Sequence, residues 1–404
     1  MGVVLRSVNL ADGTTTDFRF AGGLITDRSK HVETQPGDVE YNGAGRLVLP
    51  AFVEPHAHLD KALSADRVLN PAGDLWGAIQ AWRANYPNLT GADIEARAEA
   101  TIRMAVAYGV TLIRTHVDVG EELGLTAIEA LIAVKSRVAS MCDVQIAVLT
   151  PPSLTVAERA NHRALTRAAL DMGAEVVGGV PHAEEDPVGC IEQSLALAAE
   201  FARPIDLHAD ENLNPHSRDL VTLCERVLVS GFSFGATASH CVSLGSVDAA
   251  TQQRTAELAA EANVAVIALP QTNLYLQARG HTTLPPRGLT AIATLRKSGV
   301  TVAGGADNVR DPFNLMGRAD PCETAALLVM AAHLDPWTAH QMCTIDARRA
   351  VGVAPANLTV GDPAELICVA AATVGEFVAS GTPDRWTFHR GVRVVTTEVR
   401  TEFA

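Results

Sequence analysis

Residues 47–60 read LVLPAFVEPHAHLD, an apolar run that ends in two histidines and an aspartate. A continuous apolar run of this length is typical of a strand buried on both faces, as in a parallel sheet. His56 and His58 are two positions apart, so both side chains point to the same face of an extended strand. The stretch therefore predicts a buried strand with polar chemistry at its C-terminal end.

Seven further runs of this kind follow, at residues 111–119, 144–149, 176–182, 204–210, 236–242, 264–270 and 300–308. From the second run onward they recur about every 28 to 36 residues, which is the length of one strand and one helix. The segments 93–108 and 156–172 between them have the spacing of amphipathic helices. Eight such units predict a distorted (β/α)8 TIM barrel over residues 49–351.

Both ends of the chain have a different pattern. Residues 1–48 and 352–404 contain short alternating segments separated by turn signals such as Pro36-Gly37 and Gly361-Asp362-Pro363. We expect these ends to assemble into one small β-sandwich-like domain. Residues 61–92, after the first run, are too many for a simple connection, and we expect them to cover the active site.

Composition limits the function classes. Of the 404 residues 48% are apolar and 19% are charged, as in a globular protein, and the formal net charge is −14. That charge argues against a nucleic-acid or anionic-membrane partner. No apolar run approaches the length of a membrane span, and the N-terminus lacks a signal-peptide pattern. Seven scattered cysteines without a C-x-x-C motif favour reduced thiols, so we expect a cytoplasmic protein. We also expect a homo-oligomer.

Polar residues gather where the predicted strands end, and this end of a barrel carries catalysis. Six of the 13 histidines lie there. The polar residues at strand ends are His56, His58, His116, Asp118, His182, His208, Asp210, Glu211, His240, Asp307 and Asn308. A single histidine on a strand is more often a packed core residue, but His56 and His58 together can bind one divalent cation. A third nitrogen from His208 and a carboxylate from Asp307 would leave one position open for water.

Glu211 lies three residues beyond His208, where it could take a proton from water and pass it to a substrate nitrogen. His240 could polarise a substrate or bind the water. His116 and Asp118 could either support a ligand or act as one, and His182 remains open between packing and substrate contact.

Other chemistries fit poorly. The glycine pairs at 178–179 and 304–305 lack nucleotide-binding spacing, and no G-x-S-x-G elbow is present. The run at 176–182 has no lysine that could bridge a second metal. We therefore expect one metal ion per chain.

Several motifs in register resemble the bacterial cytosine deaminases of the amidohydrolase superfamily, over residues 46–350. They are LVLPAFVEPHAHLD, RTHVDV, VVGGVPH, IDLHADE, ATASH, NLYLQARG and GADNVRDPFN. The resemblance implies a distorted barrel with one catalytic Fe2+ or Zn2+. It also implies that His56, His58, His208 and Asp307 are the ligands, that Glu211 is the proton shuttle and that His240 orients water and substrate.

The substrate-contacting positions depart from that family. Pro151 stands where cytosine deaminases have a glutamine, Asn308 replaces a carboxylate and Phe313 replaces a tryptophan. Lys61 and the Asp-Asn-x-Arg-Asp run are similar instead to isopropylammelide aminohydrolases, whereas Glu211 is similar to the cytosine branch.

These observations predict a metal-dependent hydrolytic deaminase that releases ammonia from a small N-heterocycle such as cytosine or a related pyrimidine. The expected substrate contacts are Lys61, His182, Gln271, Asn308 and Phe313. Two alternatives remain open. One is hydrolysis of an alkylamino-triazine, a creatinine-like ring or a cyclic amide at the same site. The other is a ligand-binding barrel without catalysis.

Overall fold

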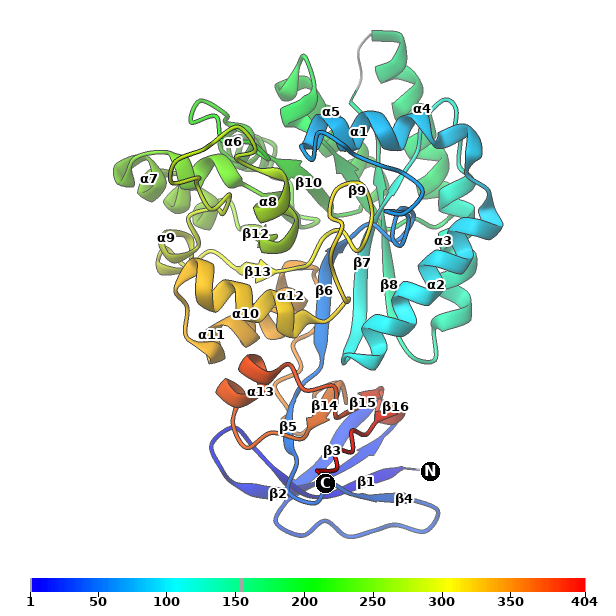
Figure 1. Ribbon diagram of the computed structural model, residues 1–404. Coiled ribbons are helices and arrows are strands. Elements are labelled where there is room, and N and C mark those ends of the chain that lie inside the picture. The colour runs from blue at the N-terminus through cyan, green and yellow to red at the C-terminus, as the bar shows by residue number, and fades with distance from the viewer. Residues whose placement is uncertain (1, 153–155, 404) are drawn as a thin grey trace.

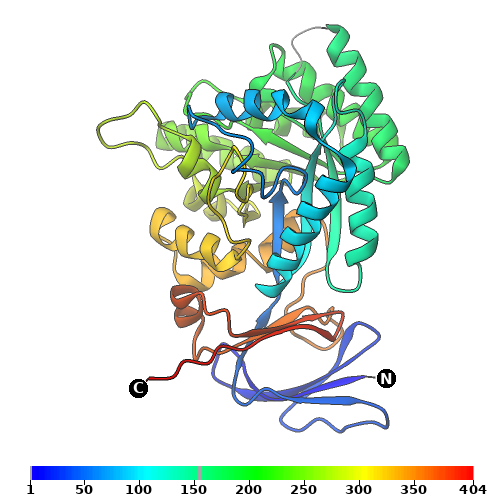
Figure 2. The ribbon, with the colours of Figure 1, turned by 45° about the vertical axis from the view of Figure 1, so that its right-hand side comes forward.

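Eight parallel strands form the barrel sheet and pair in chain order (Figures 1 and 2). A computed structural model describes residues 2–152 and 156–403. The strands are β6 (Phe52–Ala57), β7 (Val110–Asp118), β8 (Asp143–Leu149), β9 (Val176–Gly179), β10 (Ile205–Ala209), β11 (Ala236–His240), β12 (Val264–Ala268) and β13 (Val302–Gly304). This arrangement confirms the predicted barrel.

The barrel closes between its first and last strands with little regular pairing. Asp307, three residues beyond β13, forms a parallel bridge with Ala57, and its N–H donates to the His56 carbonyl at 3.1 Å. Below this bridge both carboxylate oxygens of Glu54 accept the N–H of Ala306, at 3.0 and 3.1 Å. The distortion of the barrel therefore lies at the strand ends that carry predicted site residues.

Helices surround these strands, and their buried faces follow the predicted period. In α2, Ile94, Ala98, Thr101, Ile102 and Ala105 are buried at spacings of three and four residues. The predicted helices 93–108 and 156–172 correspond to α2 and α4. The helices are α1 (Leu75–Ala84), α2 (Gly91–Ala107), α3 (Thr126–Val138), α4 (Val156–Met172), α5 (Pro187–Phe201), α6 (Asp219–Ser230), α7 (Ala249–Glu261), α8 (Pro270–Leu276), α9 (Ile292–Lys297), α10 (Pro321–Ala332), α11 (Pro336–Met342), α12 (Ile345–Ala350) and α13 (Val374–Ser380), with short turns η1 (Tyr86–Asn88), η2 (Pro181–Ala183) and η3 (Val242–Ser246).

Strands from both ends of the chain form a second sheet, as expected. Its order is β16-β15-β14-β5-β1-β2-β3, and β4 also pairs with β1. The sheet buries one apolar core around Phe18, Phe20, Trp386 and Phe388. Its strands are β1 (Val3–Asn9), β2 (Thr15–Ala21), β3 (Leu24–Ser29), β4 (Val39–Asn42), β5 (Leu47–Pro50), β14 (Leu366–Val369), β15 (Arg385–His389) and β16 (Val392–Thr397). The exact domain boundaries stay a prediction.

The first apolar run is not one barrel strand, which corrects our expectation. Its first part, β5, pairs antiparallel with β14 in the terminal sheet. The Ala51 N–H still bonds to the Glu365 carbonyl at 3.1 Å, whereas the Phe52 N–H bonds to Gly109 of the barrel at 2.9 Å. A continuous apolar run indicates that a segment is buried on both faces. Because this segment is buried in both sheets, its sequence could not show where the chain passes from one sheet to the other.

The long segment 61–92 contains α1 and η1 and lies at the end of the barrel opposite the terminal sheet (Figure 1). This is the end to which the polar strand termini point. Among the helices of the described residues, none is both long and apolar enough to cross a membrane.

A buried ion pair joins the terminal sheet to the barrel, and we predict that it contributes strongly to stability. The Arg385 guanidinium on β15 donates to Asp320 at 3.3 Å and to the Tyr108 carbonyl at 2.8 Å. Arg385→Met should lower the free energy of unfolding by about 3–5 kcal/mol, because the Asp320 carboxylate would stay buried without its cation. Urea unfolding measures this loss.

The matched control is Arg390→Met, which breaks an exposed pair with Asp143 and should cost at most about 1 kcal/mol. Equal unfolding midpoints for the two variants would contradict the prediction.

Candidate active site

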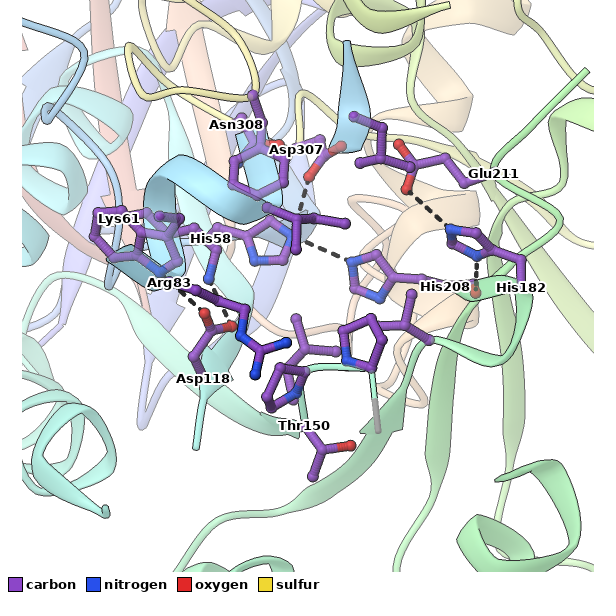
Figure 3. A pocket seen from close by; sticks show the side chains of 18 of the residues that line it. His58, Lys61, Arg83, Asp118, Thr150, His182, His208, Glu211, Asp307 and Asn308 are labelled. Atoms are coloured by element: carbon purple, nitrogen blue, oxygen red, sulfur yellow. Dashed lines mark hydrogen bonds and ion pairs between the residues drawn. The ribbon is translucent and has the colours of Figure 1, made fainter. Parts of the chain in front are cut away.

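A cavity opens at the C-terminal end of the barrel strands (Figure 3). Polar groups from the strand ends form its floor, and α1 with η1 forms one wall. The lining residues are His58, Lys61, Leu75, Ile79, Trp82, Arg83, Tyr86, Asp118, Leu149, Thr150, Pro151, Pro152, Val180, His182, His208, Glu211, His240, Asp307, Asn308 and Phe313. The prediction that residues 61–92 cover the active site agrees with this lining.

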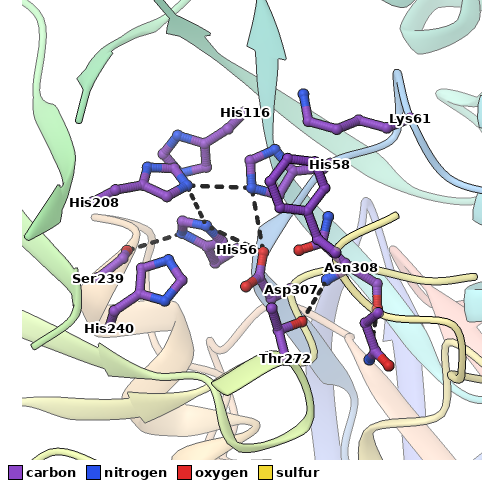
Figure 4. A network of polar contacts seen from close by, with 12 residues as sticks. His56, His58, Lys61, His116, His208, Ser239, His240, Thr272, Asp307 and Asn308 are labelled. Carbon is purple, nitrogen blue, oxygen red and sulfur yellow. Dashed lines mark hydrogen bonds and ion pairs between the residues drawn. The ribbon is translucent and has the colours of Figure 1, made fainter. Parts of the chain in front are cut away.

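Three imidazoles and one carboxylate converge at the floor (Figure 4). Nε2 of His208 lies 3.1 Å from Nε2 of His56 and 3.2 Å from Nε2 of His58. Oδ1 of Asp307 lies 3.2 Å from Nε2 of His58 and 3.6 Å from Nε2 of His56. The four predicted ligands therefore present one atom each to a common point.

The spacing and protonation of these groups fit a divalent cation. Ligands at about 2.0–2.1 Å from a tetrahedral metal lie roughly 3.3 Å from each other, close to the observed separations. Burial lowers the pKa of His56, His58 and His208 well below the usual histidine value, so the rings are neutral, as metal ligation requires. Oδ1 of Asp307 is buried without a hydrogen-bond partner among the described residues. A cation would satisfy this cluster of lone pairs.

A hydrogen-bond chain below the cluster sets the tautomer of His56. The Ser239 hydroxyl donates to Asp206 at 2.7 Å, so it can only accept from Nδ1–H of His56, at 2.9 Å. The proton on Nδ1 leaves the lone pair on Nε2, the atom that faces the cluster. Asp206 in turn accepts from the buried Arg114 at 3.0 Å. The sequence analysis did not identify Ser239, Asp206 or Arg114.

His116 lies against the ligand group. Its ring centroid is 4.1 Å from that of His56, and neither ring nitrogen has a hydrogen-bond partner within the described chain. Two groups of three could hold a metal ion, namely His56, His116 and His208, and His56, His58 and Asp307. His116 therefore packs against the predicted ligands, with its Nε2 3.7 Å from Asp206, and its role stays as open as the sequence left it.

Glu211 and His182 lie on the opposite side of the cavity from α1. The Glu211 carboxyl lies 3.4 Å from Nδ1 of His240 and 4.0 Å from Nε2 of His182. Burial raises the pKa of Glu211 to about 8. Nδ1–H of His182 donates to the His208 carbonyl at 3.0 Å, so its Nε2 carries the lone pair. Glu211 is therefore placed, with its proton, at the cavity wall.

Asn273, which the sequence analysis missed, contacts both His240 and Glu211. Its amide Nδ2 lies 3.1 Å from Nδ1 of His240 and 3.4 Å from Glu211. With Nδ1 of His240 accepting, the ring proton lies on Nε2. His240 adopts a positive φ of 71° and Asp307 one of 70°, conformations that cost energy for residues other than glycine.

Gln271, an expected substrate contact, lies outside the cavity lining. Its amide donates to Thr324 of α10 at 2.7 Å. The chain turns helical at Pro270, and residues two apart on a helix point to nearly opposite sides. Gln271 therefore points away from the site, and Asn273 points toward the lining residues His240 and Glu211. A helix start at Pro270 was the signal available in the sequence.

Lys61 lies in the lining, but carboxylates already surround its ammonium group. Nζ lies 2.6 Å from Asp118 and 3.1 Å from Asp60. The other oxygen of Asp118 accepts from Trp82 Nε1 at 3.0 Å and from Tyr86 Oη at 2.9 Å. Asp118 thus links the α1 wall to β7.

Asn308 and Phe313 also line the cavity, as predicted. The Asn308 amide donates to Asp311 at 2.7 Å, and Asp311 accepts the Phe313 N–H at 2.9 Å. Asp311 is buried, and burial raises its pKa to about 6. Pro151, which stands in place of a family glutamine, lines the same cavity without offering an amide.

A comparison with known proteins identifies the family of this chain. A sequence model of the amidohydrolase family matches residues 75–385. This chain belongs to the amidohydrolase family. The resemblance inferred from the motifs is therefore confirmed, and the chain is a hydrolase that acts on carbon–nitrogen bonds.

Individual relatives of this amidohydrolase act on nitrogen heterocycles. A pterin deaminase from Rhizobium rhizogenes is 31% identical over 401 residues, covering 96% of this chain and 88% of that protein. The crystal structure of 5-methylcytosine deaminase from Klebsiella pneumoniae with phosphonocytosine has a TM-score of 0.90 at 29% identity, and both chains are covered completely. N-isopropylammelide isopropylaminohydrolase from Burkholderia multivorans has a TM-score of 0.86 at 27% identity, with 98% of each chain covered.

We predict that Ser239 supports the metal site of this amidohydrolase from below. Ser239→Ala removes the acceptor for Nδ1–H of His56, so the ring no longer keeps its lone pair on Nε2. Zn2+ affinity, measured by competition with a chromogenic chelator, should fall about 10- to 100-fold. Ser243→Ala, a buried serine outside this chain of bonds, is the control. Equal affinities in all three proteins would refute the role of Ser239.

Proposed function

We propose that this amidohydrolase is a metal-dependent deaminase that replaces the amino group of an aminopyrimidine-type ring with oxygen and releases ammonia. The observation that carries the proposal is the convergence of His56, His58, His208 and Asp307 beside a buried, protonated Glu211. A divalent cation held there would lower the pKa of a coordinated water toward about 7 and keep Asp307 ionised.

Glu211 is suited to donate a proton to a ring nitrogen. Its pKa of about 8 keeps the carboxyl protonated at neutral pH, and it reaches into the cavity beside His182 and His240. A proton delivered to the nitrogen next to the reacting carbon would stabilise the tetrahedral intermediate. Glu211 regains a proton from the new hydroxyl as the carbonyl forms.

Asp307 and His240 complete the proposed chemistry. Asp307 accepts the proton that water loses and passes it to the departing amino group, which leaves as ammonia. Nε2–H of His240 is free to orient the attacking oxygen because Asn273 occupies Nδ1. The carbon–nitrogen bond breaks as the carbon–oxygen bond forms, and no oxidant is required.

The substrate class follows from the cavity and from the relatives. Trp82, Tyr86 and Phe313 supply aromatic walls that suit a flat ring, and Lys61 and Asn308 supply donors near the floor. The relatives include deaminases of 5-methylcytosine and pterin. Both rings carry an amino group on a carbon beside a ring nitrogen, so one site geometry serves either.

A second candidate is release of an alkylamine from a triazine. Lys61 and the Asp-Asn-x-Arg-Asp run favour it, and so does the 27% identity to the isopropylammelide enzyme. Product analysis separates the two reactions, since only deamination yields free ammonia. The screen should contain cytosine, 5-methylcytosine, isocytosine, pterin, creatinine and amino-triazines. A purified chain with far less than one metal and no activity after metal loading would favour a ligand-binding barrel instead.

We propose Fe2+ or Zn2+ as the metal, because imidazole nitrogens with one carboxylate suit both. Seven free cysteines support a reducing cytoplasm, and the net charge of −14 supports an enzyme without a nucleic-acid or membrane partner. We also keep the expectation of a homo-oligomer.

Glu211→Gln tests the proton donor. The amide keeps the size of the side chain but cannot deliver the proton, so ammonia release should fall at least about 100-fold while metal content persists. Glu192→Gln, which changes an exposed carboxylate on α5, should leave both unchanged. Undiminished turnover in Glu211→Gln would remove Glu211 from this role.

The pH profile tests the protonation state of Glu211. Its pKa is raised to about 8, so the acid form predominates below that pH and is lost above it. As a donor, Glu211 should make kcat/KM fall as pH rises through about 8, approaching tenfold per unit. The residual activity of Glu211→Gln should lack this alkaline decline. A wild-type rate that increases across the same window would contradict the assignment.

A further inference from the structure

We propose that Arg83 binds an anionic substituent, a carboxylate, on the ring that this enzyme deaminates. The inference rests on the proposed function and narrows its substrate class. The Arg83 side chain lines the cavity and extends into the ring of lining side chains (Figure 3).

Arg83 belongs to the inward face of the α1 wall. The residues of this wall that line the cavity are Leu75, Ile79, Trp82, Arg83 and Tyr86. Their spacing of three to four residues describes one side of a helix that continues into η1. Every other member of this face is apolar or aromatic, so Arg83 is its one cation.

Arg83 has no anionic partner within residues 2–152 and 156–403. Asp118 is a carboxylate that contacts this wall, and both of its oxygens already have partners. Oδ1 contacts Lys61 at 2.6 Å, and Oδ2 accepts from Trp82 and Tyr86 at 3.0 and 2.9 Å. A guanidinium in a largely apolar cavity gains most from a ligand that brings its own negative charge.

The other charged groups of the lining are committed elsewhere. Lys61 is neutralised by Asp60 and Asp118, and Asp307 lies at the metal cluster. Glu211 is protonated at neutral pH. Among the described residues that line the cavity, Arg83 is therefore the one charged group without an opposite charge in contact with it.

A carboxylate matches this charge better than a phosphate does. One planar guanidinium pairs with one carboxylate through two parallel hydrogen bonds. A phosphate monoester carries about −1.5 to −2 charges at neutral pH and would need further free cations. Among the described lining residues Lys61 is the only other fixed cation, and it is already paired.

If Arg83 only stabilised α1, its substitution would have a different effect on stability and kinetics. Arg83 lies in the last turn of α1, where a cation interacts favourably with the helix dipole. Its loss would then affect stability, and it would affect all substrates equally. A change in KM for carboxylated substrates alone would therefore distinguish carboxylate binding by Arg83 from a role in stabilising α1.

The experiment compares ring pairs that differ only in a carboxylate, namely cytosine with 5-carboxycytosine and pterin with 6-carboxypterin. The wild type should prefer at least one carboxylated ring in kcat/KM. Arg83→Gln should raise KM for that ring about 10- to 100-fold, with kcat and the uncarboxylated partner within about twofold. Arg83→Lys should retain part of the preference. Arg103→Gln on α2, which is exposed and removes the same charge, is the control.

A second arm measures binding of the oxo products, uracil with 5-carboxyuracil and lumazine with 6-carboxylumazine, by calorimetry on the metal-loaded protein. Arg83-dependent binding of a carboxylated ring without ammonia release would uphold this inference and refute the proposed deamination. Ammonia release with no preference for a carboxylate, or equal losses for both members of a pair in Arg83→Gln, would refute the inference alone. Absence of binding and reaction with every carboxylated ring would also refute it.

Discussion

Neutral imidazole nitrogens and a carboxylate oxygen, held 3.1–3.6 Å apart at the end of a barrel, are the constraint around which this structure is organised. Lone pairs at such distances repel unless a cation lies between them. The surrounding protein must hold His56, His58, His208 and Asp307 in place regardless. The strand ends, the barrel closure and the buried polar chain below all contribute to this positioning.

The support for the cluster comes from two directions. From below, Ser239, Asp206 and Arg114 fix the orientation of His56 through bonds of 2.7–3.0 Å. From the side, the bridge between Ala57 and Asp307 closes the barrel at the ligand positions themselves. The contact that closes the barrel therefore also positions Asp307, one of the predicted ligands.

Much of this arrangement could be predicted from the sequence, because strand ends in a parallel barrel meet at one face. The spacing of two between His56 and His58, and the polar ends of later runs such as His208, predicted which side chains converge at this end of the barrel. Contacts between side chains along the strands, away from the strand ends, could not be predicted. Arg114 and Asp206 are 92 positions apart, and no local pattern relates them.

The local backbone conformation, which decides where a side chain points, was the second feature that could not be predicted from the sequence. Gln271 and Asn273 are equally polar, and only the start of α8 at Pro270 decides which one faces the site. Likewise, the sequence could not show that Arg83 lacks an acidic partner, because arginine is common in amphipathic segments. That became clear only from the contacts of Asp118 with Lys61, Trp82 and Tyr86.

The direct connection between β5 and β6 also limits how the terminal sheet can be replaced or shortened. Pro50 is paired in the terminal sheet, and His56, six positions later, belongs to the ligand cluster. That short stretch is rigidly paired on both sides of Ala51. The terminal sheet is thus no detachable module. Grafting it from a relative or deleting its last strands would disturb the anchor of β6, the strand that carries His56, so the two parts must diverge together.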